Sequence, residues 1–392
     1  MNAVRGAPYE WRMISSPEAI DDLAGEWRGL DGASQLFARH EWHRAAATHL
    51  LRESGPSYVR ISEGDRPVAI VPVFQDEAPI PLLGRVEAIS SGFNAHVPFF
   101  DFPVAANACV GAIAGALEDA MRHLRCDALV WRRLAHDGNA LRVARALGGP
   151  AASLMPKRVC PFIETRRGYD AVMECISKNL RANLRKASRK LEEGGGVRFT
   201  SETGLPHDDP AARDRMRAAY EIFLAIEASG WKGREGTGSA IALNAPERAF
   251  YAALIDSASP SFLPEIEILW QGERPLAAQY SLQVNGIKHA LKAAYDEEQK
   301  RNSPGHVLLA HIVETACARG LAGMSLVTEN PWLDAWRPRR DPAYGAVRLR
   351  SRAKGALVRG YLAVKPYIAR EQPGKAAPPG LSPKADEASG SA

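Results

Sequence analysis

Cysteine is scarce in this chain of 392 residues, and its few copies are scattered. Their number is odd, and there is no Cys-x-x-Cys pair and no group of His and Cys at the spacing of metal ligands. This pattern argues against a disulfide framework and against structural zinc. It favours reduced thiols buried in the core, with a catalytic thiol as the alternative. The five are Cys109, Cys126, Cys160, Cys175 and Cys317.

Long apolar runs are absent as well. No segment approaches the roughly 18–20 apolar residues that a membrane-spanning helix needs. The N-terminal stretch MNAVRGAPYEWRMISS lacks the apolar region of a secretory signal. We therefore expect the protein in the cytoplasm, and we expect no metal cofactor.

Charge is nearly balanced, with a net value of +5, but the basic residues are concentrated. They gather in residues 177–190 (SKNLRANLRKASRK) and in residues 337–375. Either segment could face phosphate, an acidic polymer or a membrane surface, and the second has apolar residues interleaved that would suit weak peripheral membrane contact.

Length and composition predict two globular domains. A chain of this size suits two domains of about 150–200 residues each, and 46% hydrophobic with 24% charged residues is typical of globular proteins. Residues 1–155 predict a hairpin that turns at residues 64–66, then helix, strand and helix over 107–124, 126–134 and 138–149. Residues 371–392 are rich in Pro, Gly, Ser and Ala and predict a disordered tail.

Residues 156–370 predict a second domain with a similar order of elements, which suggests an internal duplication. A long helical stretch over 168–195 precedes a strand over 195–202 and two helices over 213–229 and 246–258. Three strands follow within 264–298, separated by turns at 271–275 and at Asn285-Gly286. A helix over 304–319 and a strand over 323–329 complete the pattern.

The start of the helix at Pro304 has the features of an anion site. Ser303 is at the expected N-cap, Pro304 at the first helical position, and Gly305 offers no side chain to block an approaching group. Lys300 and Arg301 come just before it. Unpaired N–H groups, a positive dipole end and two cations would suit a pyrophosphate. The alternative is an ordinary Ser-Pro helix start.

Three passages in order resemble the acyl-CoA-binding core of CelD-type and FemAB-like acyltransferases of the GNAT superfamily. They are SKNLRANLRKASRKLEEGGGVRF (177–199), FLAIEASGWKGREGTGSAI (223–241) and AYDEEQKRNSPGHVLLAHIVETACARGL (294–321). The resemblance spans roughly residues 160–330 and is looser in the N-terminal half. It implies an α/β (α+β) fold of two tandem GNAT-like domains, with mixed central sheets flanked by helices.

The same resemblance implies a co-substrate and a mechanism. Acyl-CoA, such as acetyl-CoA, would bind at Lys300, Arg301, Ser303, Pro304, Gly305 and Leu308. Transfer would be direct, in a ternary complex, with strand N–H groups polarising the thioester carbonyl. The chain departs from the family where an acidic residue, a Gly-rich turn and a Lys often follow this helix. Here Ser325 and Thr328 are followed by Trp332, Trp336 and Arg337, which bears on the identity of the acceptor.

Candidate catalytic residues are Glu227, Tyr295 and Asp296. Because the attacking amine must be neutral, Glu227 or Asp296 could accept its proton, and Tyr295 could protonate the leaving thiolate. The alternative for Asp296 is a strand-end residue that caps the turn. The alternative for Glu227 is a solvated helix end, with Trp231 filling the core.

Candidate acceptor-binding residues lie on the same elements. Trp231 and Lys232 would form a wall and hold an anion, and either Gln279 or Tyr280 should face the site. His289 would share a strand face with Leu291, Ala293 and Tyr295, and could instead be a core residue. Arg181 and Arg185 belong to the basic side of a helix that could bind the acceptor or merely be solvated.

The leading hypothesis is therefore an acyl-CoA-dependent N-acyltransferase acting on an amine of a cell-envelope or polysaccharide-related acceptor. One alternative is an aminoacyl-tRNA-dependent transferase of the FemAB type, although no motif resembles an RNA reader and we expect no nucleic-acid partner. Another is a non-catalytic accessory protein of polysaccharide synthesis. The sequence predicts neither the acyl chain length nor the oligomeric state.

Overall fold

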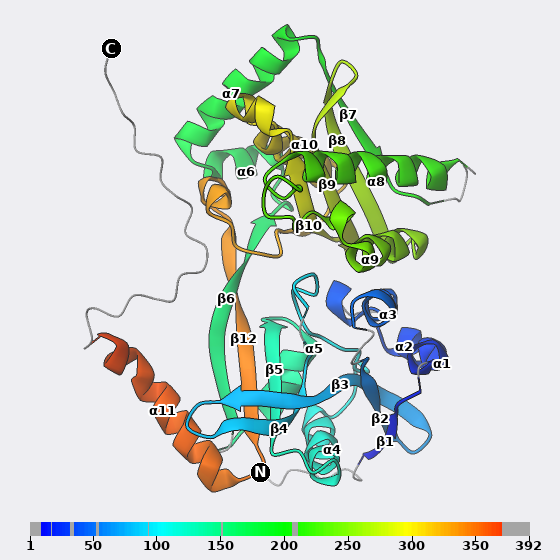
Figure 1. Ribbon diagram of the computed structural model, residues 1–392, viewed down its shortest axis with the longest axis vertical. Coiled ribbons are helices and arrows are strands. Elements are labelled where there is room, and N and C mark those ends of the chain that lie inside the picture. Colours follow the sequence, from blue (N-terminus) through cyan, green and yellow to red (C-terminus); the bar gives the residue numbers. More distant parts are fainter. Residues whose placement is uncertain are drawn as a thin grey trace.

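The computed structural model describes residues 9–16, 18–31, 35–51, 55–92, 94–149, 152–205 and 211–370, without the side chains of residues 156–158 and 364–370. The predicted disordered tail, residues 371–392, lies outside the described residues. Within the described part, one mixed sheet of twelve strands runs through the molecule in the order β1-β2-β3-β4-β5-β12-β6-β11-β10-β9-β8-β7. Helices cover it, which confirms the predicted α/β class (Figure 1).

The N-terminal half contains the predicted hairpin, the helices over 110–123 and 139–146 and the strand between them. A first strand, a fourth strand and the helices before the hairpin were not predicted. The elements are β1 (Glu10–Ile14), α1 (Ala19–Asp22), α2 (Ala24–Asp31), η1 (Leu36–Ala38), α3 (His40–His49), β2 (Ser57–Glu63), β3 (Arg66–Ile80), β4 (Gly84–Ser90), α4 (Val110–His123), β5 (Ala128–Ala135) and α5 (Asn139–Ala146).

The C-terminal half follows the predicted order closely. The long helical stretch is in fact two helices, because Ser177 interrupts it and its hydroxyl accepts the N–H of Leu180 as an N-cap. The elements are α6 (Tyr169–Cys175), α7 (Lys178–Glu193), β7 (Val197–Glu202), α8 (Ala212–Ser229), η3 (Ile241–Leu243), α9 (Ala245–Asp256), β8 (Leu263–Gln271), β9 (Arg274–Val284), β10 (Ile287–Tyr295), η4 (Glu297–Asn302), α10 (Pro304–Ala318), β11 (Gly323–Ser325) and η5 (Pro331–Trp336).

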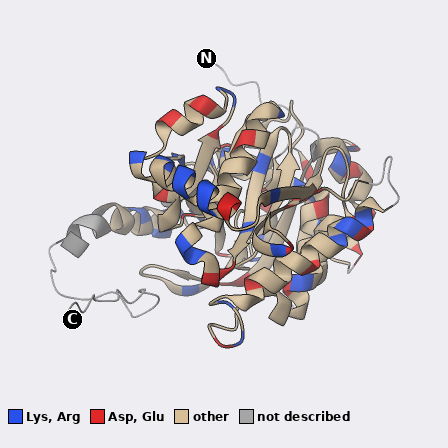
Figure 2. Cartoon of the chain, turned by 90° about the horizontal axis from the view of Figure 1, so that it is seen from above, with Lys and Arg blue, Asp and Glu red and all other residues tan. Residues whose placement is uncertain are grey.

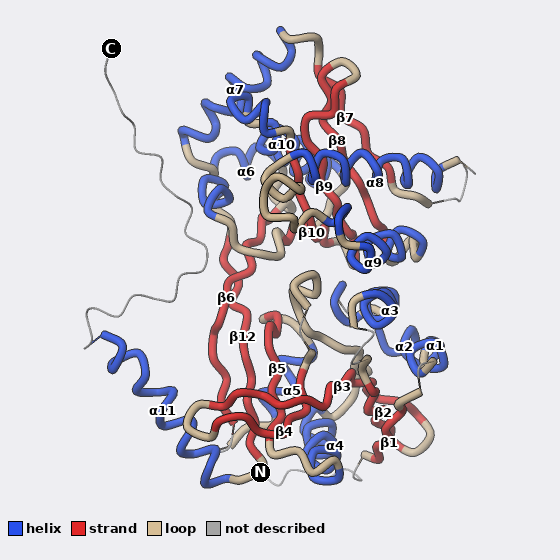
Figure 3. Tube along the Cα trace, in the orientation of Figure 1, coloured by secondary structure: helices blue, strands red, loops and turns tan. Residues whose placement is uncertain are grey.

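Two long strands, β6 (Ala152–Glu164) and β12 (Arg339–Leu349), join the halves (Figure 3). β12 returns from the C-terminal half and pairs with both β5 and β6. Helix α11 (Arg352–Arg370) then packs Val358 in a cluster with Leu349 and Ile80. The expected boundary near residue 155 falls inside β6, and β12 and α11 lie against the N-terminal half. The division into two domains stays a prediction.

A shared hydrophobic core also fuses the halves. Phe37 and Trp42 of the N-terminal half pack in one cluster with Phe223 and Phe250 of α8 and α9. The opposite face of the C-terminal sheet is covered by α6, α7 and α10, whose apolar side chains pack in a second cluster with Leu184.

The expectation that the cysteines are buried needs correction. All five are free thiols, and of these Cys126 is buried, Cys160 and Cys317 are half-buried, and Cys109 and Cys175 are exposed at helix ends.

Candidate functional site

The N-terminus of α10 is open, but it differs in detail from the expected cap. Ser303 occupies the N-cap in the left-handed conformation, with φ 46° and ψ 47°, and its side chain makes no cap hydrogen bond. Its carbonyl instead accepts the N–H groups of His306 and Val307 at 3.0 and 3.2 Å. A Cβ on Gly305 would meet only the ring of Tyr295, at 3.8 Å, so the backbone here remains approachable.

Cations surround this helix start. Lys300 and Arg301 lie in η4, are exposed, and form no ion pair with any residue that the structure describes. Helix α7, which has a basic, exposed side, contacts both η4 and α10. Figure 2, which looks down on this end of the molecule, shows Lys and Arg along one helix there. The N–H of Gly305, the positive end of the α10 dipole and these side chains together would suit a doubly charged phosphate group.

Strand β10 presents an open edge beside that helix start. It pairs with β11 only from Ile287 to His289, whereas its pairing with β9 continues to Tyr295. The strands part because Val327, just after β11, has φ 61° and turns the chain away. Alternate N–H groups within residues 290–295, those that point away from β9, are therefore left without a strand partner, and a thioester carbonyl could be polarised there.

A β-bulge at Leu291 changes which side chains share a face of β10. The register shifts between Ala290 and Lys292, so the expected alternation of His289, Leu291, Ala293 and Tyr295 on one face is wrong. Beyond the bulge, Ala294 lies on the face of His289 and packs in the shared core. Tyr295 lies on the α10 face, beside Gly305.

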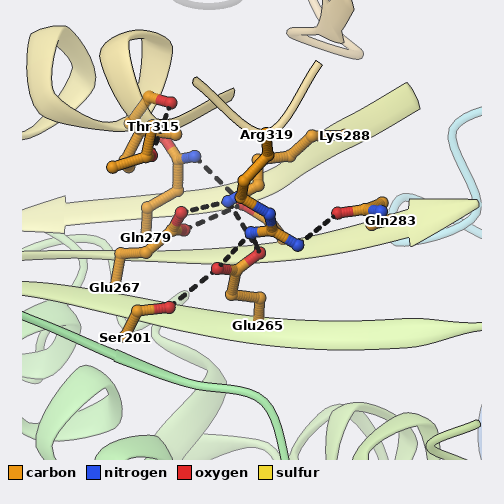
Figure 4. A network of polar contacts seen from close by, with 10 residues as sticks. Ser201, Glu265, Glu267, Gln279, Gln283, Lys288, Thr315 and Arg319 are labelled. Carbon is orange, nitrogen blue, oxygen red and sulfur yellow. Dashed lines mark hydrogen bonds and ion pairs between the residues drawn. The ribbon is translucent and has the colours of Figure 1, made fainter. Parts of the chain in front are cut away.

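Buried polar side chains fix α10 to the sheet (Figure 4). Lys288 is fully buried and pairs with Glu265 at 2.8 Å and with Glu267. Arg319, which follows α10, donates to both oxygens of Glu265 at 2.9 and 3.0 Å. Burial raises the pKa of Glu267 to about 7. The network anchors the helix whose other end is the candidate anion site.

The two neighbouring residues of β9 face opposite ways. Gln279 donates to Ser281 at 3.0 Å within the network under α10. Tyr280 is fully buried on the other face, and its hydroxyl donates to the carbonyl of Tyr251 at 3.0 Å. Neither side chain is exposed, so their acceptor-binding role stays a prediction.

Glu227 is buried, and its carboxylate holds the loop that follows α8 by two hydrogen bonds. One carboxylate oxygen accepts from Lys232 at 2.7 Å and the other from the N–H of Ile241 at 2.9 Å. The solvated helix end is therefore wrong for Glu227. Trp231 does not fill the core either, because its side chain is 57% exposed. Its backbone N–H donates to the carboxylate of Glu297 in η4 at 3.0 Å. The loop thus lies directly beside the candidate anion site.

Asp296 and Tyr295 lie at the entrance to η4. Asp296 accepts the N–H of Glu298 at 3.0 Å and the guanidinium of Arg274 at 2.8 Å, the contacts of a turn cap. Tyr295 is 37% exposed, and burial raises the pKa of its phenol, which keeps it protonated. Tyr295 is therefore placed as a protonated phenol, the form that its predicted role as proton donor needs. Asp296, the predicted base, is instead paired with a cation.

The other predicted residues are dispersed. Leu308 is buried in the α10 core and cannot touch a ligand without rearrangement. Arg185 is exposed, and Arg181 donates to the carbonyl of Glu174 at 3.0 Å. His289 is buried beside Phe37, and burial lowers its pKa to about 3. It is an uncharged core residue in this structure.

Four residues that the sequence did not single out gather on the face of β10 opposite α10. Lys292 follows the bulge, Glu247 and Tyr251 come from α9, and His96 comes from the loop after β4. His96 contacts Tyr251 and Glu247, each at 3.0 Å. Only the bulge could have signalled Lys292, and nothing local in the sequence marks its position.

A cavity of about 190 Å³ lies between the halves near Val327. It is lined by Ala95, Pro98, Phe99, Arg133, Val159, Val327, Thr328, Glu329 and Ala343. Two of the residues that depart from the family pattern lie near this cavity. Thr328 lines it, whereas Ser325 contacts the thiol of Cys160 at 3.3 Å.

Within the described part of the chain, His, Cys, Asp and Glu side chains form no cluster that could hold a metal ion. Every helix described is too short or too polar to span a bilayer.

Solved structures with a similar fold include FemX, with TM-score 0.55 and 11% identity over 87% of this chain and 97% of that one. Another is L-PGS from Bacillus licheniformis, with TM-score 0.51 and 11% identity over 86% and 95%. The C-terminal domain of a putative lysylphosphatidylglycerol synthetase from Agrobacterium fabrum has TM-score 0.50 and 11% identity over 88% and 96%. At these identities the likeness concerns the fold alone.

Among curated proteins no sequence matches this chain significantly. The family described as acetyltransferase (GNAT) domain matches residues 178–336, from the start of α7 to the end of η5. That range includes the open edge of β10, η4 and the N-terminus of α10. Residues 178–336 are therefore similar to a GNAT-type acetyltransferase domain.

Proposed function

We propose that this protein transfers an acyl group from acyl-CoA directly to an amine, within a ternary complex. The observation that supports it best is the open edge of β10 next to the cationic start of α10. Lys300 and Arg301 would hold the pyrophosphate of CoA together with the N–H of Gly305 and the positive end of the α10 dipole. The thioester would then lie along residues 290–295, where the N–H groups that point away from β9 can polarise its carbonyl.

The acceptor and the setting are part of the same proposal. We infer that the acceptor is an amine of a cell-envelope or polysaccharide-related molecule. We also infer that the protein acts in the cytoplasm and makes weak membrane contact through its basic segments. The resemblance to the CelD type supports this acceptor class and stays a prediction. Glu227, Tyr295 and Asp296 remain the catalytic residues predicted from the sequence, although Glu227 is paired with Lys232 and Asp296 with Arg274.

Binding of CoA tests the donor site. We expect acetyl-CoA to bind the native chain in isothermal titration calorimetry and Arg301→Ala to weaken binding by about 1–3 kcal/mol, the usual value of a charge-assisted contact. The matched control is Arg359→Ala on α11, an exposed cation far along the chain from η4, which should leave the affinity unchanged. Equal affinity of native and Arg301→Ala chains would rule out the phosphate position.

A second candidate donor is an aminoacyl-tRNA. The basic side of α7 favours it, and so do the relatives named FemX and lysylphosphatidylglycerol synthetase. An RNA donor would neutralise many phosphates, so its binding would weaken steeply with salt, whereas CoA binding would respond weakly. Binding of CoA without thiol release in the presence of amines would instead favour a non-catalytic accessory protein.

A further inference from the structure

The face of β10 opposite α10 carries a cation, Lys292, that has no anionic partner among the residues that the structure describes. The side chain of Lys292 makes no hydrogen bond or ion pair within the described residues, and its Nζ lies 5.9 Å from the centroid of the Tyr251 ring. Burial, and next the charge of Lys232, lower the pKa of Lys292. An ammonium held in this way is costly unless an anion completes its surroundings.

The two nearby carboxylates are held by other groups. Glu227 is fully used by Lys232 and the N–H of Ile241. Glu247 accepts from Asn244 through one oxygen at 3.0 Å and lies 3.0 Å from Nε2 of His96 through the other. Glu247 therefore has no cation within ion-pair distance, and Lys292 has no anion. The two opposite charges face the same region without touching.

His96 fixes the direction of Glu247. Burial, with the charges of Lys292 and Lys232, lowers the pKa of His96 to about 4, so the ring is neutral near pH 7. Its Nε2–H then donates to Glu247 while Nδ1 accepts from the hydroxyl of Tyr251, an assignment that follows from the two partners. A carboxylate held by neutral groups keeps its charge available for a ligand.

We propose that this region binds an acceptor that carries both an amine and an anionic group, with Lys292 holding the anion and Glu247 taking the proton of the amine. The proposal rests on the function proposed above, because it needs the thioester on the adjacent open edge of β10. Lys292 lies on that edge segment, just after the bulge, on the face away from α10. Separated charges of both signs complement an amino acid or an amino sugar acid or phosphate.

The reaction balances with these groups. The acceptor ammonium gives one proton to the carboxylate of Glu247, whose pKa burial raises toward that of a useful base. The freed nitrogen lone pair attacks the thioester carbon, a C–N bond forms and the C–S bond breaks. The leaving thiolate takes the second proton from nitrogen, which yields the amide and free CoA thiol, and Glu247 returns its proton to water.

Matched amines test the anion site. Thiol release from acetyl-CoA is measured with β-alanine against propylamine and with glucosamine 6-phosphate against glucosamine, so that carboxylate and phosphate are separate arms. We expect the anionic member of at least one pair to be favoured in kcat/KM by about tenfold to 100-fold. Lys292→Gln should abolish that preference, and Lys292→Glu should reverse it in favour of a diamine such as putrescine. A reversal cannot come from misfolding.

Protection from labelling provides a readout that does not depend on turnover. Reductive methylation of Lys292 is followed by peptide mass spectrometry, with exposed Lys354 as the internal control. Inorganic phosphate or β-alanine should slow labelling of Lys292 and leave Lys354 unaffected. Equal use of both members of each pair, or no turnover together with no protection, would overturn the proposal. CoA titration separates the two ideas: CoA binding without anion preference removes only the acceptor site, whereas no CoA binding removes the proposed function as well.

Discussion

At the scale of single residues, His289 is an unusual core residue. It is 5% exposed, and neither ring nitrogen has a hydrogen-bond partner in the described structure. Burial lowers its pKa from 6.5 to about 3. Because the unfolded chain binds this proton and the folded chain does not, the folded state loses stability as the pH falls from about 6.5 toward 3.

His289→Leu should remove this acid sensitivity. At pH 7 the variant should be at least as stable as the native chain, since no buried polar atom is left unpaired. At pH 4.5 it should exceed the native chain by about 3 kcal/mol in the free energy of unfolding, two units of pKa shift at 1.36 kcal/mol each. Urea unfolding at both pH values measures the difference, with exposed His123→Leu as control. If the free energy of unfolding of the native chain and of His289→Leu depended on pH equally, His289 would be hydrated and not buried as described. If a stable His289→Leu variant lost acceptor turnover, the predicted role of His289 in substrate binding would be supported.

At the scale of elements, the loop after α8 depends on close backbone approach. A Cβ at Gly236 would lie 1.8 Å from the carbonyl oxygen of Trp231, and one at Gly233 would lie 2.1 Å from that of Ala228. Two loop hydrogen bonds hold the same geometry, from Thr237 to Trp231 at 2.8 Å and from Ala240 to Lys232 at 2.9 Å. The sequence GWKGREGTG is thus shaped by contact with backbone.

Gly236→Ala should open this loop. We expect a loss of about 1–3 kcal/mol in the free energy of unfolding, the usual range for a substitution that the backbone cannot accommodate. Gly115→Ala is the matched control, because this glycine lies in the middle of α4 with nothing near its added Cβ, and there alanine should stabilise by about 0.5–1 kcal/mol. Urea unfolding compares the two. Equal stability of both variants would mean that the loop is not packed as described.

Local signals predicted most elements and none of the irregularities. The Asn285-Gly286 turn and the Pro304 start marked β9, β10 and α10 because turn and cap chemistry is contained within a few residues. The bulge at Leu291 depends on the register with β9, which no local pattern reveals. That single residue places Lys292 on the same face as His289 and Tyr295 on the opposite one, so the cluster around Lys292 could not be predicted.

Contacts between segments far apart in the sequence could not be predicted either. His96 reaches Glu247 across 151 residues, and Trp231 reaches Glu297 across 66. The candidate anion site was predictable because it is built from consecutive residues, 300–305. The region on the other face of β10 was not, because it is assembled from α9, β10 and the loop after β4.

At the scale of the whole molecule, the shared core should make the two halves unfold together. Trp42 of α3 packs edge-to-face on Phe250 of α9, with ring centroids 5.3 Å apart. We expect a single calorimetric transition, and we expect Trp42→Ala to lower its midpoint at a cost of about 3–5 kcal/mol. Trp131→Ala, a buried tryptophan whose cluster is confined to the sheet and helices around β5, is the comparison. Two transitions, with Trp131→Ala shifting only one of them, would contradict a common core.

The position of β12 has a consequence for synthesis on the ribosome. The strand inserts between β5 and β6, although 174 residues separate its start at Arg339 from the end of β6 at Glu164. At synthesis rates of about 5–20 residues per second, the edges of β5 and β6 wait on the order of ten seconds or more for their partner. A nascent chain thus offers two unpaired strand edges during translation, and a factor that shields such edges would raise the yield of correctly assembled protein.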